Sequence, residues 1–149
     1  MGNTGQIKAN EVQVMSAGTG IFHSEYNADA KIPLKLFQIW VFPSVKNLRP
    51  RYEQKAFDLA ERKDKWQRLV SPDEPGALLL NQKTWFSRTV LSAGQSIGYT
   101  LNDISHGVYI FVIEGSVEAD GILLETRDGM GISEASEICI RHQRTRISW

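Results

Sequence analysis

Short runs of β-forming residues alternate with glycine-containing turns through the second half of the chain. The turns are Glu114-Gly115, Asp120-Gly121 and Asp128-Gly129, which are dipeptides that suit tight reversals. The runs that we predict as strands lie at residues 77–82, 84–91, 97–101, 107–113, 116–119, 122–125 and 136–141. Residues 108–113 are apolar on both faces, which predicts a central strand. This pattern indicates an all-β fold, either a β-sandwich or a jelly-roll barrel.

The first half of the chain carries fewer strand signals. Residues 11–16 form a short strand candidate, and residues 34–42 form a stronger one that Pro43 ends. Both faces of residues 34–42 are apolar, which predicts burial on both sides. Residues 50–65 give the only helix prediction, because four apolar side chains there lie at near-helical spacing. The prolines and glycine of residues 71–76 predict a loop.

Composition places this chain among folded proteins. The 149 residues are 42% hydrophobic and 23% charged, which suffices for a core without disulfides. Cys139 is the single cysteine, so no internal disulfide can form, and its apolar neighbours predict a small packed side chain. No apolar run is long enough for a membrane-spanning helix, and the first residues lack an apolar leader. We therefore expect a cytoplasmic protein with no membrane partner.

The net charge of zero conceals a local imbalance. Residues 46–70 carry eight basic and four acidic side chains, whereas residues 71–149 carry six basic and ten acidic side chains. The overall balance argues against nucleic-acid binding driven by charge. The basic stretch at 46–70 has two interpretations, a solvated connector or a patch that binds an anion or an acidic partner.

His23 and Glu25 are the best candidates for chemistry. If residues 22–26 are extended, the two side chains point to the same face, because side chains alternate along a strand. An imidazole nitrogen beside a carboxylate oxygen suits Fe, Mn, Ni, Cu or Zn. The alternative is a hydrogen-bonded polar pair at the mouth of a barrel.

Several segments together resemble the pirin family of bicupins, some of which act as quercetin 2,3-dioxygenases. They are residues 1–5 (MGNTG), 12–21 (VQVMSAGTGI), 23–27 (HSEYN), 38–40 (QIW), 50–54 (PRYEQ), 71–73 (SPD), 112–117 (VIEGSV) and 128–129 (DG). The resemblance spans nearly the whole chain. It implies a remnant of a first cupin barrel at residues 1–45, a basic connector with a short helix at 46–70, and a second cupin barrel at 71–149.

The resemblance also implies a metal site in the first barrel, made by three histidines and one glutamate. His23 and Glu25 match two of these ligands, and Glu25 is also the candidate general base. The other two histidines form an H-x-H motif that precedes the Met-Gly-Asn segment in the family. This chain begins at that segment. We therefore expect an N-terminally truncated chain that holds a divalent metal loosely, if it holds one at all.

The second barrel offers a poorer ligand set. The cupin ligand positions fall on Leu101, Asp103 and Gly107, and His106 lies one residue out of register, on the other face. We expect no metal there.

The resemblance leaves two functions open. The first is a metal-dependent dioxygenase that acts on a flavonol-like substrate, with weak or no activity in this shortened chain. The second is a non-catalytic binding protein or transcriptional co-regulator. A barrel that lacks strands also exposes strand edges, so a homodimer that pairs these edges is a further expectation.

Overall fold

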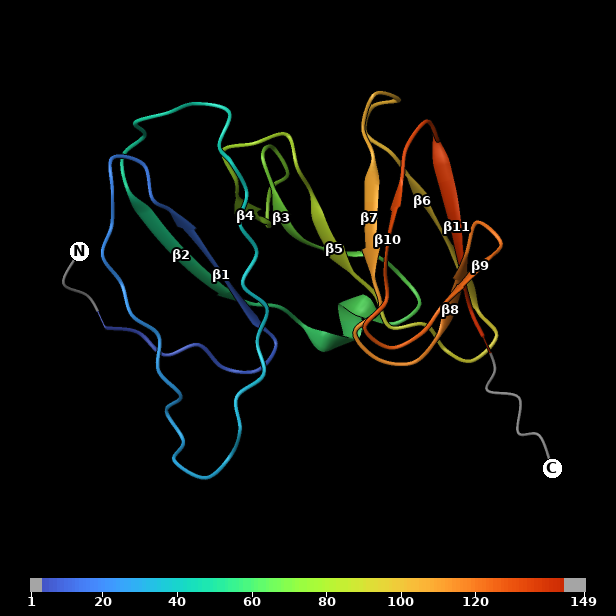
Figure 1. Ribbon diagram of the computed structural model, residues 1–149, viewed down its shortest axis with the longest axis horizontal. Helices are drawn as coiled ribbons and strands as arrows, with labels where there is room; N and C mark the ends of the chain where they lie inside the picture. Colours follow the sequence, from blue (N-terminus) through green and yellow to red (C-terminus); the bar gives the residue numbers. More distant parts are fainter. Residues whose placement is uncertain (1–3, 144–149) are drawn as a thin grey trace. The chain divides into compact units, whose positions relative to one another are not determined.

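The computed structural model describes residues 4–143 and is built almost entirely of β-strands (Figure 1). The described residues contain one short 3₁₀ helix and no α-helix, which confirms the all-β prediction. No helix within this range is long and apolar enough to cross a membrane. The chain divides into two compact units. Unit 1 comprises the residues up to Glu61 together with Gln67–Arg88, and unit 2 comprises Arg62–Trp66 and the residues from Thr89 onward.

Unit 1 contains two small sheets. Strands β1 (Glu11–Ser16) and β2 (Arg51–Ala56) pair antiparallel along their full length. Strands β3 (Gln67–Ser71), β4 (Leu78–Leu79) and β5 (Phe86–Arg88) form a second sheet with the order β4-β3-β5.

The core of unit 1 is small. Val14, Val70 and Leu78 are its buried hydrophobic residues. Val12 lies two residues before Val14 and packs against the same cluster, as strand alternation requires. On this face of the ribbon, β1 therefore contributes apolar side chains to the core, whereas their ladder partners in β2 are the charged Lys55 and Glu53.

The helix that we predicted at residues 50–65 is wrong. Strand β2 occupies its first part, and only the 3₁₀ helix η1 (Leu59–Arg62) follows. Of the four apolar residues behind the prediction, only Phe57 packs against the core, whereas Ala56, Leu59 and Ala60 are exposed. Without a buried apolar face, pairing with β1 determines the conformation.

The strand that we predicted at residues 34–42 is also wrong. No strand lies between Ser16 and Arg51 (Figure 1). Every residue from 22 to 40 is exposed. Trp40, for example, is 86% exposed. A strand exists only when a neighbouring strand accepts its hydrogen bonds, and no described strand pairs with this segment. Its two apolar faces remain uncovered.

Unit 2 contains one larger sheet and one two-stranded ladder. The larger sheet has the order β6-β11-β8-β9, formed by Ser96–Thr100, Glu137–His142, Val117–Ala119 and Ile122–Leu124. The ladder pairs β7 (Val108–Phe111) with β10 (Gly129–Ile132). The buried residues are Val112, Ala119, Leu124, Ile138 and Ile140.

The turn between β8 and β9 follows the sequence prediction. Asp120 and Gly121 have φ values of +50° and +75°, and the two strands pair in register on either side. Two successive positive φ angles are the requirement of a type I′ hairpin, which the Asp-Gly dipeptide satisfies.

Two predictions for unit 2 are corrected. Strand β7 pairs with β10 alone, so it is not a central strand, and Tyr109 and Phe111 are exposed on one face. Cys139 is exposed rather than packed. It alternates with the buried Ile138 and Ile140, so its side chain lies on the opposite face of β11.

Candidate functional site

In the β1–β2 ribbon, the face that carries Gln13 is the one away from Val12 and Val14. Val12 and Val14 project to the core of unit 1, whereas Gln13 lies on the other face. Gln54 stands directly opposite Gln13 in the ladder, and Tyr52 lies two residues before Gln54 on the same strand. Three polar side chains therefore share one face of the ribbon.

These side chains form a hydrogen-bonded network that ends on Glu25. The amide of Gln13 donates to Glu25 Oε1 at 2.8 Å. The Tyr52 hydroxyl lies 3.2 Å from Gln13 Oε1 and 2.6 Å from Gln54 Oε1, either of which can accept its proton. Gln54 Nε2 in turn donates to Glu11 Oε2 at 2.7 Å. A side chain of the two-stranded ribbon thus holds one oxygen of the Glu25 carboxylate.

A tight turn begins the segment that carries Glu25. Gly20 N–H donates to Ala17 O at 2.8 Å, and Thr19 N–H donates to Leu48 O at 3.1 Å. Gly18 has a φ of +54°, and a Cβ built on it would lie 2.0 Å from Leu48 O. Only glycine fits at this position, because any side chain would collide with the backbone of Leu48.

His23 and Glu25 both lie in the exposed segment after this turn. Residues 22–26 form no strand, so the alternation that we expected to align the two side chains is not imposed by a ladder. Within residues 4–143, no group of three or more His, Cys, Asp or Glu residues could hold a metal ion. The two residues therefore fit a divalent transition metal in the type of donor they offer, but they do not make a closed set of ligands.

Sequence reasoning missed Gln13 as a partner of Glu25. The bond joins residues 12 positions apart and depends on where the loop returns over the ribbon. One signal was present: Gln13 stands between Val12 and Val14, so strand alternation places it on the face away from the core.

Several basic residues of the stretch at 46–70 form hydrogen bonds or ion pairs within unit 1. Arg51 bonds to Glu53 and to the carbonyl of Leu79, and Lys55 bonds to the carbonyl of Gly76. Arg68 forms an ion pair with Glu74 at 2.9 Å. These bonds favour the interpretation of a solvated connector over that of an anion-binding patch.

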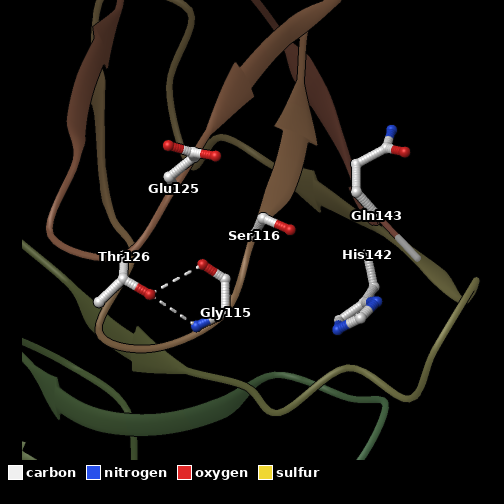
Figure 2. Close-up of a pocket in the computed structure, with 6 residues that line it drawn as sticks. All are labelled: Gly115, Ser116, Glu125, Thr126, His142 and Gln143. Carbon is white, nitrogen blue, oxygen red and sulfur yellow. Dashed lines mark hydrogen bonds between the residues drawn. The ribbon is translucent and has the colours of Figure 1, made fainter. Parts of the chain in front are cut away.

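A separate hollow of about 360 Å³ lies in unit 2 (Figure 2). Its lining residues are Gly115, Ser116, Glu125, Thr126, His142 and Gln143. Thr126 Oγ1 accepts from Gly115 N–H at 3.0 Å and lies 3.1 Å from Gly115 O, which closes one side of the hollow. His142 Nδ1 is buried and has no hydrogen-bond partner in the described part of the chain. His23 and Glu25 do not line this hollow.

In unit 2, Asp103 has a local role. Its Oδ1 accepts from the Ser105 N–H at 2.8 Å and from the Ser105 hydroxyl at 2.7 Å. The backbone N–H of His106 donates to Asp103 O at 3.0 Å. The candidate ligand position at Asp103 is therefore part of a turn before β7.

Two protein families match the chain. The family described as the quercetinase C-terminal cupin domain covers residues 68–146, and the pirin family covers residues 1–41. The first match covers more than half of the chain, and it coincides with the region where the sequence predicted a second cupin barrel.

Individual proteins show the same similarity. The chain is 39% identical over 142 residues to a quercetin 2,3-dioxygenase of Escherichia coli K12 and 36% identical over 142 residues to a pirin-like protein of Caulobacter vibrioides. Each alignment covers 94% of this chain, but only 59% and 60% of the respective relative. The chain thus spans about three fifths of the length of these relatives.

Two solved structures show the same similarity. The crystal structure of YhhW from Escherichia coli superposes with a TM-score of 0.89 at 37% identity, over 95% of this chain and 59% of that one. The structure of the bacterial pirin YhhW with nickel(II) gives a TM-score of 0.87 at 36% identity, over 95% of this chain and 60% of that one. The cupin description and the structural match confirm the jelly-roll class, which was one of the two that the strand pattern left open and the one that the resemblance implied. The chain belongs to the pirin family of cupin proteins.

Proposed function

We propose that His23 and Glu25 supply two ligands of a divalent metal site of the quercetin 2,3-dioxygenase type. The observation that carries this proposal is the bond from Gln13 to Glu25, because an outer hydrogen bond that orients a carboxylate is typical of metal ligands. Residues 1–41 match the pirin family, and a pirin of Escherichia coli has been crystallised with nickel(II). Residues 1–45 would then belong to the first cupin barrel, and residues 71–149 to the second.

The chemistry of such a site divides between the metal and the protein. A bound divalent ion would act as a Lewis acid toward the oxygen atoms of a flavonol-like substrate. Gln13 already donates to Glu25 Oε1, so Oε2 is the atom on which Glu25 would bind the metal or accept the hydroxyl proton of the substrate. His23 would act as a neutral imidazole ligand.

The isolated chain should have weak activity or none, because two protein donors do not define a ligand set. The test is to incubate the purified chain with Fe, Mn, Ni, Cu or Zn, measure the retained metal by elemental analysis and follow the loss of quercetin. We expect less than one metal per chain and much slower turnover than the Escherichia coli relative shows in the same assay. Absence of retained metal in all five incubations would overturn the metal site, and turnover equal to that of the relative would overturn the weak activity.

Gln13→Leu should weaken metal binding without unfolding unit 1. The leucine fills a similar volume on the exposed face but cannot donate to Glu25, so the carboxylate loses its fixed orientation. We expect the Ni²⁺ affinity, measured by calorimetry, to fall about tenfold. Gln54→Leu is the matched control, since Gln54 faces Gln13 in the ladder but has no bond to Glu25. Equal losses for the two variants would refute the role of Gln13.

A further inference from the structure

The hydroxyl group of Tyr52 has two hydrogen-bond acceptors within reach and can donate to only one of them at a time. Its oxygen lies 3.2 Å from Gln13 Oε1 and 2.6 Å from Gln54 Oε1. A phenol carries a single O–H proton, and both of these atoms are amide carbonyl oxygens, which accept hydrogen bonds and cannot donate them. The two glutamines therefore compete for one proton.

The orientation of the Gln54 amide is fixed by two other bonds. Gln54 Nε2 donates to Glu11 Oε2 at 2.7 Å and to the carbonyl oxygen of Gln6 at 2.9 Å. If the amide turned over, its own carbonyl oxygen would face these two acceptors and both bonds would be lost. Gln54 Oε1 is therefore held toward the Tyr52 hydroxyl.

The Gln13 amide depends on its neighbours at both ends. Its Nε2 donates to Glu25 Oε1 at 2.8 Å, so its Oε1 faces Tyr52. When the Tyr52 proton points to Gln13, both ends of the amide are hydrogen-bonded and the N–H end is directed at Glu25. When the proton points away, two oxygen atoms face each other at 3.2 Å, and this orientation of the amide is disfavoured. The Tyr52 hydroxyl thus controls which end of Gln13 meets Glu25.

The register of the ladder gives Tyr52 access to Gln13. Tyr52 stands opposite Met15, two residues from Gln13, so it is the diagonal neighbour of Gln13 on the same face. Diagonal neighbours lie within reach of an aromatic side chain. We propose that Tyr52 is a positioning residue for Glu25 that acts through Gln13 Oε1, and that Gln54 weakens this action by competing for the hydroxyl proton. Its consequence for metal binding rests on the site in "Proposed function", whereas its consequence for the Gln13 amide does not.

The first test observes the side-chain amide of Gln13 by NMR in metal-free protein. Tyr52→Phe keeps the ring but has no proton to donate, so the Gln13 amide proton should shift toward the position of a solvent-exposed glutamine and exchange faster with water. Gln54→Leu removes the competitor, so the signal should stay in place or shift the other way. The signal is assigned by its loss in Gln13→Leu. A Gln13 signal that does not move in Tyr52→Phe would overturn the proposal.

The second test measures Ni²⁺ affinity by calorimetry. Tyr52→Phe should bind Ni²⁺ about three- to tenfold more weakly, which is the effect of one hydrogen bond. Gln54→Leu should bind Ni²⁺ at least as tightly as the unchanged chain, because the Tyr52 proton is then free for Gln13. Tyr109→Phe, at an exposed tyrosine of unit 2, is the matched control and should change neither measurement.

The two tests separate this proposal from the metal site. Equal losses of affinity in Tyr52→Phe and Gln54→Leu would mean that the network has only a structural role, and they would overturn the proposal. If the unchanged chain binds no Ni²⁺ while the Gln13 signal still follows Tyr52, then the metal site is wrong and the role of Tyr52 in directing Gln13 to Glu25 stands.

Discussion

Replacing Leu78 with alanine should lower the free energy of unfolding by about 2–5 kcal/mol. Leu78 is fully buried and packs with Val14 and Val70, which are the only other buried members of the described core of unit 1. The change removes three carbon atoms from a core that is too small to close over the cavity. Because native domains have a net stability of about 5–15 kcal/mol, this loss approaches the stability of a small unit.

Leu79→Ala is the matched control for this prediction. Leu79 follows Leu78 in β4, but it is 44% exposed, and its carbonyl rather than its side chain accepts the bond from Arg51. We expect this variant to lose less than about 1 kcal/mol in urea unfolding followed by circular dichroism. Similar losses for the two leucines would show that the core of unit 1 lies elsewhere.

Gly18→Ala should destabilise unit 1 by about 2–4 kcal/mol, combining the cost of a left-handed backbone with that of a steric overlap. The new Cβ would lie 2.0 Å from the carbonyl oxygen of Leu48, and a backbone atom cannot rotate away as a side chain does. The turn would have to open, which would break the bond from Thr19 N–H to Leu48 O. Residues 21–25, which follow the turn, would lose their fixed starting point.

Gly131→Ala provides the comparison. A Cβ at Gly131 meets no atom within 4 Å, and the residue does not adopt a left-handed conformation. Urea unfolding should show a change of less than about 1 kcal/mol for this variant. If Gly18→Ala is equally harmless, then the turn is not constrained by Leu48.

Where strands are joined by short turns, local sequence was enough to predict them. Residues 116–119 and 122–125 were predicted as strands and contain β8 and β9. Asp120 and Gly121 fix the reversal between β8 and β9, so each strand there finds its neighbour within a few residues. Alternation and turn chemistry carry enough information in such cases.

Local sequence failed for some strands whose conformation depends on distant partners, although β1, β6 and β11 were predicted. Strand β2 pairs with β1, which lies far away in the sequence, and its local residues suggested a helix instead. Strand β10 has glycines at positions 129 and 131 and gave no apolar alternation. Residues 34–42 show the reverse case, because a strong strand pattern stays unpaired when no neighbouring strand is present.

In the candidate site too, the residue types could be predicted from the sequence, but their contacts could not. The residue types at positions 23 and 25 are visible in the sequence and match a family motif, so His23 and Glu25 could be named at once. The link through Tyr52 to Gln54 depends on the register of the β1–β2 ladder. The bond from Gln13 to Glu25 depends on how the loop after β1 folds back against the ribbon. Those depend on long-range packing, which no local pattern encodes.

The central claim, that His23 and Glu25 are metal donors, is tested most directly by the Ni²⁺ affinity of single variants. Calorimetric titration should show at least a tenfold loss for His23→Ala and for Glu25→Gln, since a direct ligand matters at least as much as an outer-shell residue. His106→Ala is the control histidine, in the turn before β7, and should bind Ni²⁺ within twofold of the unchanged chain. Unaltered affinity in His23→Ala and Glu25→Gln, or an equal loss in His106→Ala, would contradict the assignment.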